Sequence, residues 1–240
     1  MKINFAVLRK IIRDKDNKSK RAIDSPTCLN EFLNVVENLF DANRKFKQDE
    51  ASNFIMSFQN WILRRGFTTY KDKVRIGDIF YADLGINYKP EFSYHHPVII
   101  LEDVNNMLMV VPVSTSDENV KAAYHPVDNP NGSKYMRKVY GKDKGRTSDG
   151  FEKTGAVLLS DVKTISKGRL IDKKGRMIDI NNPDSVFREI KTSVYKSCFP
   201  KESIKYDKLS AEYLKLQQKF DELLEDNSTV EQEVAFTKEQ

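Results

Sequence analysis

The chain has 240 residues, a mass of 27.8 kDa and a formal net charge of +5. Its 14 phenylalanines, 10 tyrosines and one tryptophan can fill a hydrophobic core, which excludes a fully disordered protein. No apolar run has the length of a membrane-spanning helix, and the charged N-terminus is unlike a secretory signal, so we expect a cytoplasmic protein without membrane partners. Cys28 and Cys198 provide neither a disulfide framework nor a zinc site.

The N-terminal part of the chain, residues 1–70, has helical periodicity. Ser25 followed by Pro26 is typical of a helix start, because the serine oxygen caps free N–H groups and proline tolerates the first turn. The apolar residues that follow at helical spacing are Leu29, Phe32, Leu33, Val36, Leu39 and Phe40. A second predicted helix ends before Gly66 and has a stripe of the same kind, made of Phe54, Phe58, Trp61 and Ile62.

Short strand-like segments follow in the middle of the chain. The predicted strands cover residues 76–84, 97–101, 107–113 and 156–165. Pro112 lies inside one of them, which predicts a sheet edge or a bulge at that point. Because no helical segments separate these strands, they favour a small antiparallel barrel over a parallel sheet.

Polar and helical segments complete the chain. Residues 116–154 are polar and contain glycine, asparagine and proline, which indicates loops or a flexible hairpin. A helix is expected to begin at Asn182-Pro183 and to end at Pro200. The last predicted helix, residues 203–226, has an a/d seam of coiled-coil type formed by Tyr206, Leu209, Tyr213, Leu216, Phe220 and Leu223. This seam is short for a dimer, and the alternative is packing on the N-terminal helices of the same chain.

Several blocks of the middle segment, taken in order, resemble the MazF/PemK family of toxins. The blocks are RIGDIFYADLG from Arg75, Glu91, HHPVIIL from His95, MVVPVSTS from Met109, and GAVLLSDVKTISKGRL from Gly155. The resemblance covers residues 74–198 and implies an α+β fold, in which a small antiparallel SH3-like (CcdB/MazF-type) barrel is flanked by an N-terminal extension (1–70) and a C-terminal helix with an acidic tail (203–240).

The family consists of mRNA interferases of toxin–antitoxin systems. The resemblance therefore implies a sequence-selective, metal-independent endoribonuclease that cleaves single-stranded RNA to 2′,3′-cyclic phosphate and 5′-hydroxyl ends. It also implies a homodimer, neutralisation by a cognate antitoxin protein that occupies the RNA groove, and DNA binding together with that antitoxin. No cofactor and no metal ligands are expected.

Three positions match the catalytic residues of the family. His96 stands where the family has an arginine, Ser114 where it has the threonine that ends the third strand, and Glu91 matches the glutamate of the loop after the first strand. A histidine with an ordinary pKa of about 6.5 can act as a base, an acid or a cation near neutral pH. His95 and Thr115, beside these positions, are expected to contact RNA, although strand alternation turns one of the two histidines away.

The polar segment supplies the remaining candidates for RNA binding. Imidazole lacks the bidentate grip of arginine, so additional positive charge is needed near the phosphate. Cations interleaved with tyrosines are typical of surfaces that bind single-stranded nucleic acid. The candidates are Lys134, Tyr135, Arg137, Lys138, Lys142 and Arg146.

Two other interpretations stay open at this point. Loss of the family arginine at His96 is also expected for a catalytically degenerate module that only binds RNA or protein. Alternatively, the helices at both ends recruit a partner and the chain acts as a scaffold. Each site candidate also has an ordinary structural explanation, since hydroxyl residues after a strand often form turns.

Overall fold

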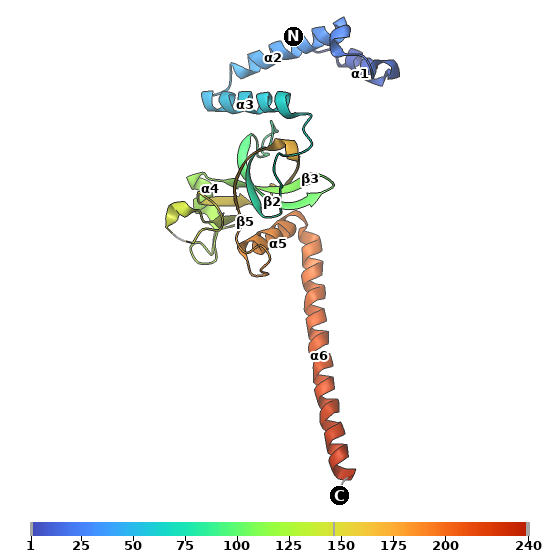
Figure 1. Cartoon of the computed structure of the whole chain (residues 1–240), viewed down its shortest axis with the longest axis vertical. Coiled ribbons are helices and arrows are strands. Elements are labelled where there is room, and N and C mark those ends of the chain that lie inside the picture. The colour runs from blue at the N-terminus through green and yellow to red at the C-terminus, as the bar shows by residue number, and fades with distance from the viewer. Residues whose placement is uncertain (1, 146, 239–240) are drawn as a thin grey trace. The chain divides into compact units, whose positions relative to one another are not determined.

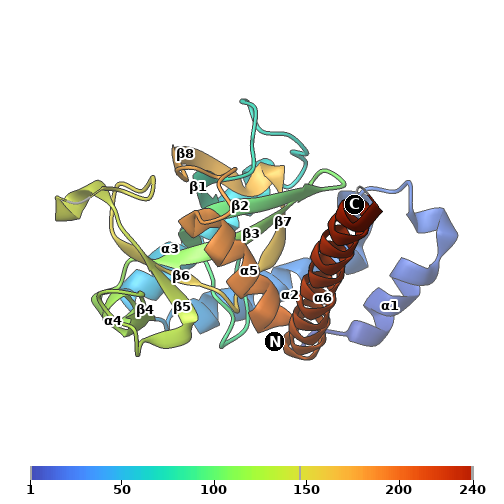
Figure 2. The same cartoon turned by 90° about the horizontal axis from the view of Figure 1, so that it is seen from below.

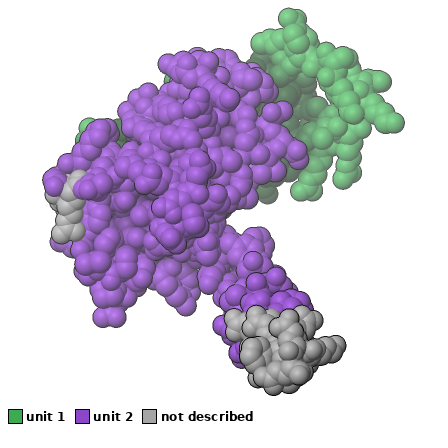
Figure 3. All heavy atoms as spheres, turned by 60° about the horizontal axis from the view of Figure 1, so that its bottom comes forward, with its two compact units in different colours: residues 1–62 green, residues 63–240 purple. Residues whose placement is uncertain are grey.

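The computed structural model describes residues 2–145 and 147–238, without the side chains of residues 144 and 225–238. The chain divides into two compact units, residues 1–62 and 63–240 (Figure 3). Each unit is described by itself. Among the described residues, no helix is both long enough and apolar enough to cross a membrane.

Unit 1 is helical, as its periodicity predicts. The Ser25 side chain accepts a hydrogen bond from the backbone N–H of Cys28 at 3.3 Å, and Pro26 is the first residue of the helix that follows. Phe54 is buried and stacks on Phe58, with ring centroids 6.0 Å apart. The helices are α1 (Phe5–Arg13), α2 (Pro26–Asn43) and α3 (Gln48–Arg64), and α3 continues into the second unit.

The apolar stripe of α2 is present but exposed. No residue of this helix, all of which the structure describes, is buried. The residues of the stripe that are most open to solvent, at 44–67% exposure, are Phe32, Leu33, Val36 and Phe40. Cys28, expected from its place beside this stripe to be a core residue, is half-buried.

Unit 2 is built on a curved sheet to which eight strands of the described residues contribute (Figure 1). The order is β4-β5-β6-β3-β2-β1-β8, and β7 also pairs with β3. Apart from the short parallel pair β4–β5, all pairs are antiparallel, as predicted. The strands are β1 (Asp78–Asp83), β2 (His95–Val104), β3 (Met107–Ser114), β4 (Ala123–Tyr124), β5 (Ser133–Val139), β6 (Gly155–Leu158), β7 (Lys163–Ser166) and β8 (Leu170–Arg176).

Both faces of the central strands are covered by apolar side chains. Along β1, Ile79 joins one buried cluster while Phe80 and Ala82 join another, as the alternating pattern predicts. The first cluster combines residues of β1, β2, β3, β5 and β6, so the sheet curls around it in the manner of a small barrel. Helix α5 (Val186–Cys198) closes this cluster with Phe187 and Ile190 (Figure 2).

The RIGDI block forms the entry to β1. Gly77 has φ +83°, a conformation that favours glycine. The carboxylate of Asp78 is fully buried and accepts a hydrogen bond from the backbone N–H of Arg75 at 2.9 Å. Lys173 and Arg176 of β8 lie 2.8 and 3.4 Å from its two oxygens. This block therefore fixes β8 against β1.

Pro112 does not lie on an edge strand, because β3 is in the interior of the sheet. On the edge away from β2, β3 pairs with β7 through residue 110 and with β6 from residue 113. Pro112 therefore lies between the residues of β3 that pair with β7 and those that pair with β6. A proline is tolerated there because its missing N–H is not needed for pairing with either strand.

The polar segment 116–154 is more regular than its composition indicates. It contains α4 (Asp117–Ala122), β4, β5 and a 3₁₀ turn at Lys142–Lys144. Strand β5 pairs antiparallel with β6, the next strand of the chain, so this part of the segment is one arm of a hairpin with a long connection.

Two helices end the chain. Ser185 caps α5 by accepting a hydrogen bond from the backbone N–H of Arg188 at 3.3 Å, so the helix begins three residues after the predicted start. Pro200 begins the next helix, α6 (Pro200–Lys238), and only Phe199 separates it from α5. Proline is well tolerated in a first helical turn.

Candidate functional site at the start of strand β2

The two histidines at the start of β2 face opposite sides of the sheet. Asp83 pairs with His95 in the ladder between β1 and β2. The His95 Nε2 lies 3.6 Å from Asp83 Oδ2, and the two side chains are only 5% and 7% exposed. The His95 ring also stacks on Tyr81, with centroids 6.0 Å apart. His95, a candidate for RNA contact, is therefore directed into the protein and joins the ends of two strands.

His96 lies on the other face and is half-buried under the loop that precedes it. Its ring centroid is 4.0 Å from that of Phe92. The pKa of His96 is lowered to about 4. Burial is the main cause, and the neighbouring His95 also lowers this pKa, whereas a hydrogen bond with the backbone of Ser93 raises it. The imidazole is therefore neutral at pH 7. Of the three roles open to a histidine here, a proton acceptor fits this state and a fixed cation does not.

A cavity of about 500 Å³ lies beside this loop, and two cations line it. The Nζ of Lys163, the first residue of β7, donates to the carbonyl oxygen of Phe92 at 2.7 Å and lies 3.7 Å from the Glu91 carboxylate. Because the Phe92 ring contacts His96, these contacts connect Lys163 and Glu91 to the half-buried imidazole. Glu91 therefore lines the cavity, whereas His96 contacts the neighbouring residue Phe92 and is not among the lining residues.

Arg169 is the second cation of the cavity. Its Nη1 donates to the carbonyl oxygen of Asp83 at 3.2 Å. Gly85 makes this approach available, since its φ is +91° and a Cβ there would lie 2.7 Å from the same nitrogen. The Asp83 carbonyl oxygen at the end of β1 and the space left by Gly85 therefore fix the Arg169 guanidinium beside the loop that follows β1.

The sequence analysis did not single out Lys163, Arg169 or Asp161. All three belong to the last family-like block, and Asp161 also lines the cavity. Burial raises the pKa of Asp161, and Lys163 opposes this rise. The available signal was the run of charged residues directly after an apolar strand; the pairing of β7 with β3 that brings Lys163 here was not readable from it.

Ser114 ends β3 on the same face of the sheet as His96. The last pair of the β2–β3 ladder is Val98 with Pro112, and the same register continued by two residues sets His96 opposite Ser114. The Ser114 side chain is buried, and its Oγ accepts hydrogen bonds from Asn119 Nδ2 at 2.8 Å and from the backbone N–H of Ser116 at 3.3 Å.

Thr115, beside Ser114, is exposed. The two residues differ in what they offer a ligand. The Ser114 hydroxyl is already held by neighbouring groups, whereas the Thr115 residue is open to solvent.

The predicted RNA-binding residues of the polar segment divide between two faces of β5. Alternation puts Lys134 and Lys138 on one face and Tyr135 and Arg137 on the other. The Arg137 guanidinium is 5% exposed and makes two hydrogen bonds to Glu189 of α5, at 2.7 and 2.8 Å. This arginine therefore links the sheet to α5 and does not face solvent.

The remaining candidates lie beyond β5. Lys142 is exposed and pairs with Glu152 at 2.8 Å. Arg146 lies outside the described residues. Within the described part of the chain, no group of three or more histidine, cysteine, aspartate or glutamate residues is arranged to hold a metal ion.

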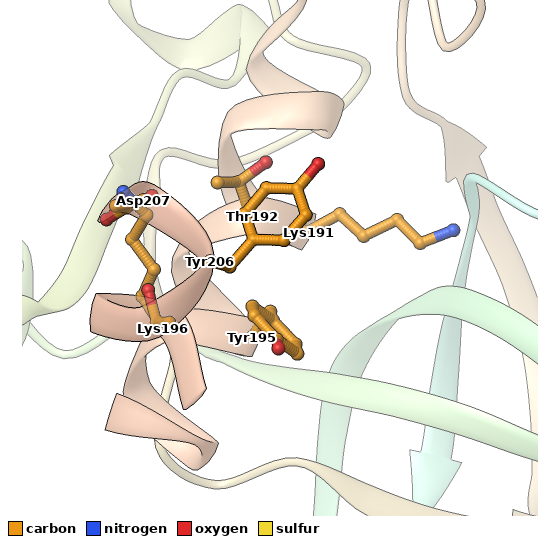
Figure 4. Close-up of a pocket in the computed structure, with 7 residues that line it drawn as sticks. Lys191, Thr192, Tyr195, Lys196, Tyr206 and Asp207 are labelled. Carbon is orange, nitrogen blue, oxygen red and sulfur yellow. Dashed lines mark hydrogen bonds and ion pairs between the residues drawn. The ribbon is translucent and has the colours of Figure 1, made fainter. Parts of the chain in front are cut away.

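A second cavity, of about 400 Å³, lies between α5 and α6 (Figure 4). Tyr195 and Tyr206 line it, and the ion pair of Lys196 with Asp207 at 3.2 Å connects the two helices at its edge. None of the predicted site residues lines this cavity.

Comparison with known proteins gives the family of the chain. A family model described as PemK-like, MazF-like toxin of type II toxin-antitoxin system matches residues 75–196, which is about half of the chain. The protein belongs to this family. Members of the PemK/MazF family are endoribonucleases, and the resemblance and the α+β fold expected from the sequence are confirmed. The helical regions before residue 75 and after residue 196 lie outside the match.

Three solved structures are similar to part of this chain. MazF (Form-I) from Deinococcus radiodurans is 11% identical, with a TM-score of 0.36 over 53% of this chain and 94% of that chain. An endoribonuclease from a mycobacterial species is 14% identical, with a TM-score of 0.34 over 55% and 95%. MazE-MazF (Form-II) from D. radiodurans is 12% identical, with a TM-score of 0.30 over 53% and 94%. No curated protein matches the chain.

Proposed function

We propose that this PemK/MazF-family protein is a sequence-selective endoribonuclease that cleaves single-stranded RNA without a metal ion. The observation that supports this proposal is a cavity of the family-matched region that is lined by two cations, Lys163 and Arg169, and lies beside the loop whose Phe92 ring contacts the neutral imidazole of His96. In this proposal the phosphodiester lies between His96 and these cations.

The proposed reaction uses each group in the state that its surroundings favour. The neutral imidazole of His96 takes the proton of the 2′-hydroxyl, whose oxygen attacks the phosphorus. Lys163 and Arg169 stabilise the negative charge that develops on the phosphate, in place of the family arginine. The leaving 5′ oxygen takes a proton from water in the open cavity, where Asp161, whose pKa is raised by burial, is placed to orient that water. The products are a 2′,3′-cyclic phosphate and a 5′-hydroxyl end.

Ser114 has a supporting role in this mechanism. Asn119 donates to its Oγ, so the hydroxyl hydrogen is directed toward another acceptor. In the free protein, the Oγ of Ser116 lies 3.1 Å away and can take that hydrogen. In the proposed complex the acceptor is a phosphate oxygen. Thr115, exposed beside it, contacts the RNA backbone.

An antitoxin protein is the proposed regulator. The family model describes toxins of type II toxin-antitoxin systems, and the cavity beside Glu91 carries cations that an acidic antitoxin segment would cover. Homodimer formation and DNA binding together with the antitoxin belong to the same proposal.

Cleavage of RNA in the presence of EDTA tests the activity directly. The purified chain is incubated with RNA of mixed sequence in EDTA, and the 5′ ends of the fragments are mapped. We expect fragments with 5′-hydroxyl ends at a restricted set of sequences. A His96→Ala preparation, purified in parallel, controls for contaminating nucleases. Equal cleavage by both preparations, or none by either, would refute the proposed activity.

The role of Lys163 predicts a loss of RNA affinity. Replacing Lys163 with glutamine is expected to weaken binding of a non-cleavable single-stranded oligonucleotide. It should also reduce the slope of log affinity against log salt by about 0.7, the value of one phosphate contact to a single strand. Fluorescence anisotropy over a salt series measures both quantities.

Lys174→Gln is the matched control for this measurement. Lys174 lies on β8 and pairs with Asp172 at 2.7 Å, away from the cavity. The control should leave affinity and salt slope unchanged. An equal loss in both variants would mean that net charge, rather than a contact at position 163, governs binding.

One observation favours a second candidate function, an RNA-binding module without catalysis. The His96 ring already contacts Phe92, and the Ser114 oxygen already accepts from Asn119. A binding module predicts that Lys163→Gln weakens RNA binding while no preparation cleaves RNA and expression causes no growth arrest. His96→Arg would then be the variant expected to create toxicity.

A further inference from the structure

Helix α6 carries a regular apolar seam that nothing in unit 2 covers along most of its length. The helix is continuous from Pro200 to Lys238 (Figure 1). Six apolar residues are spaced alternately by three and four positions, and each is 60–67% exposed. They are Tyr206, Leu209, Tyr213, Leu216, Phe220 and Leu223.

The spacing of this seam is the heptad spacing of a coiled coil. Every d position of the described part is a leucine, namely Leu209, Leu216 and Leu223, and the a positions are aromatic. Beyond the described side chains the sequence keeps the spacing, with Asn227, Val230 and Val234 at positions a, d and a. A single asparagine at an a position is the usual way to fix register in a parallel pair.

Helix α5 covers only the start of α6. Ser203 is buried at this junction, and Lys196 pairs with Asp207 (Figure 4). Tyr206, the first residue of the seam, lines the small cavity beside Tyr195. From Leu209 onward the seam is open, so its partner is another chain or the N-terminal helices of this one.

The length and width of the seam favour a second copy over the N-terminal helices. At 1.5 Å per residue, the seam and its continuation in the sequence, from Tyr206 to Val234, span about 42 Å of α6, whereas α2 with 18 residues is about 27 Å long. The α2 stripe is also wide, with Leu29, Phe32 and Leu33 within its first turns, whereas a seam that repeats every seven residues fits a helix of the same period. A second α6 has the required length, period and residues.

We propose that α6 pairs with α6 of a second copy of this chain in a parallel, in-register, two-stranded coiled coil. In this arrangement Leu216 packs against Leu216 of the other copy. The pair joins two toxin domains through a segment outside the family-matched residues 75–196. It goes beyond the proposed nuclease function and does not depend on it.

Cysteine cross-linking within the full chain tests the pairing. Both native cysteines are first replaced, as Cys28→Ser and Cys198→Ser, and then Leu216→Cys or Gln218→Cys is added. Leu216 is at a d position in the seam and Gln218 at an f position on the outer face, two residues further along the same helix. Mild oxidation at low protein concentration is followed on non-reducing gels.

We expect Leu216→Cys to form disulfide-linked dimers about tenfold faster than Gln218→Cys, because paired thiols have a high effective concentration. A dimer held only by the barrel domains would not produce this difference. Equal rates for the two variants would overturn the proposal. So would an antiparallel pair, in which Leu216→Cys cross-links only after Tyr213→Cys is added to the same chain.

A charge in the seam provides a second, independent measurement. Leu216→Asp combined with Leu223→Asp should weaken self-association in sedimentation equilibrium, whereas Ala211→Asp combined with Gln218→Asp, both at f positions on the outer face, should not. Circular dichroism and RNA cleavage report whether the rest of the chain stays folded. Unchanged association in the seam variant, with a folded domain, would also overturn the proposal.

Discussion

Replacing His96 with alanine is expected to lower the rate of RNA cleavage by about 10²- to 10⁴-fold, the usual contribution of a positioned general base. The reason is that the neutral imidazole is the proposed acceptor of the 2′-hydroxyl proton, and alanine offers no acceptor. Because the ring also packs on Phe92, a His96→Gln variant, which keeps volume at this site, should be measured beside it. Single-turnover cleavage of a labelled oligonucleotide gives the rates.

His125→Ala is the control for this prediction. His125 lies next to Tyr140, with ring centroids 5.1 Å apart, in a part of the chain that does not line the cavity. Replacing His125 should leave the cleavage rate of the folded protein unchanged. If His96→Gln cleaves as fast as the native chain, His96 is not the base.

The pH dependence of the same rate gives a further check on His96. With a pKa of about 4, the imidazole becomes protonated only as the pH falls through this value. The basic form is thus present throughout the neutral range. We expect cleavage to be lost on the acidic side near pH 4 and to show no step from this group between pH 6 and 8. A step near the ordinary histidine pKa of about 6.5 would contradict the buried environment.

Replacing Arg137 with methionine is expected to lower the free energy of unfolding by about 2 kcal/mol. Breaking a buried ion pair costs about 3–5 kcal/mol, and the cost is smaller here because Glu189, at 38% exposure, stays partly solvated. The variant also loses the hydrogen bond from Nη1 to the carbonyl oxygen of Lys138. Urea denaturation measures the change.

Lys138→Met is the matched control, since it removes a neighbouring cation from the opposite face of β5. It should change stability little. RNA affinity of the folded Arg137→Met protein should equal that of the native chain, because the guanidinium is directed at Glu189. A stable Arg137→Met protein with weakened RNA binding would instead support the contact expected from the sequence.

Local chemistry was predictable from the sequence. The Ser25-Pro26 helix start follows from groups within three residues of each other, and so does the alternation of β1. The family blocks also identified the loop that carries Glu91 and the strand that carries His96. These features depend on neighbours in the chain, which a single sequence displays.

The missing parts of the site depend on pairing between distant residues. Lys163 reaches the carbonyl oxygen of Phe92, 71 positions earlier, because β7 pairs with β3. Arg137 is buried because Glu189, 52 positions later, lies on the helix that covers the sheet. Periodicity and composition carry no information on which strand or helix lies opposite, so Arg137 was assigned from charge alone and Lys163 was not singled out.

The position of Pro112 has a consequence for the cavity. Its nitrogen carries no hydrogen to donate to a neighbouring strand, and it lies in β3 between the residues that pair with β7 and those that pair with β6. The connection from β6 to β7 is a turn in which the Asp161 N–H donates to the carbonyl oxygen of Leu158 at 3.0 Å, and Asp161 lines the cavity. A proline in the interior of the sheet thus lies opposite the gap between two strands, and the turn that spans this gap brings a carboxylate to the proposed substrate site.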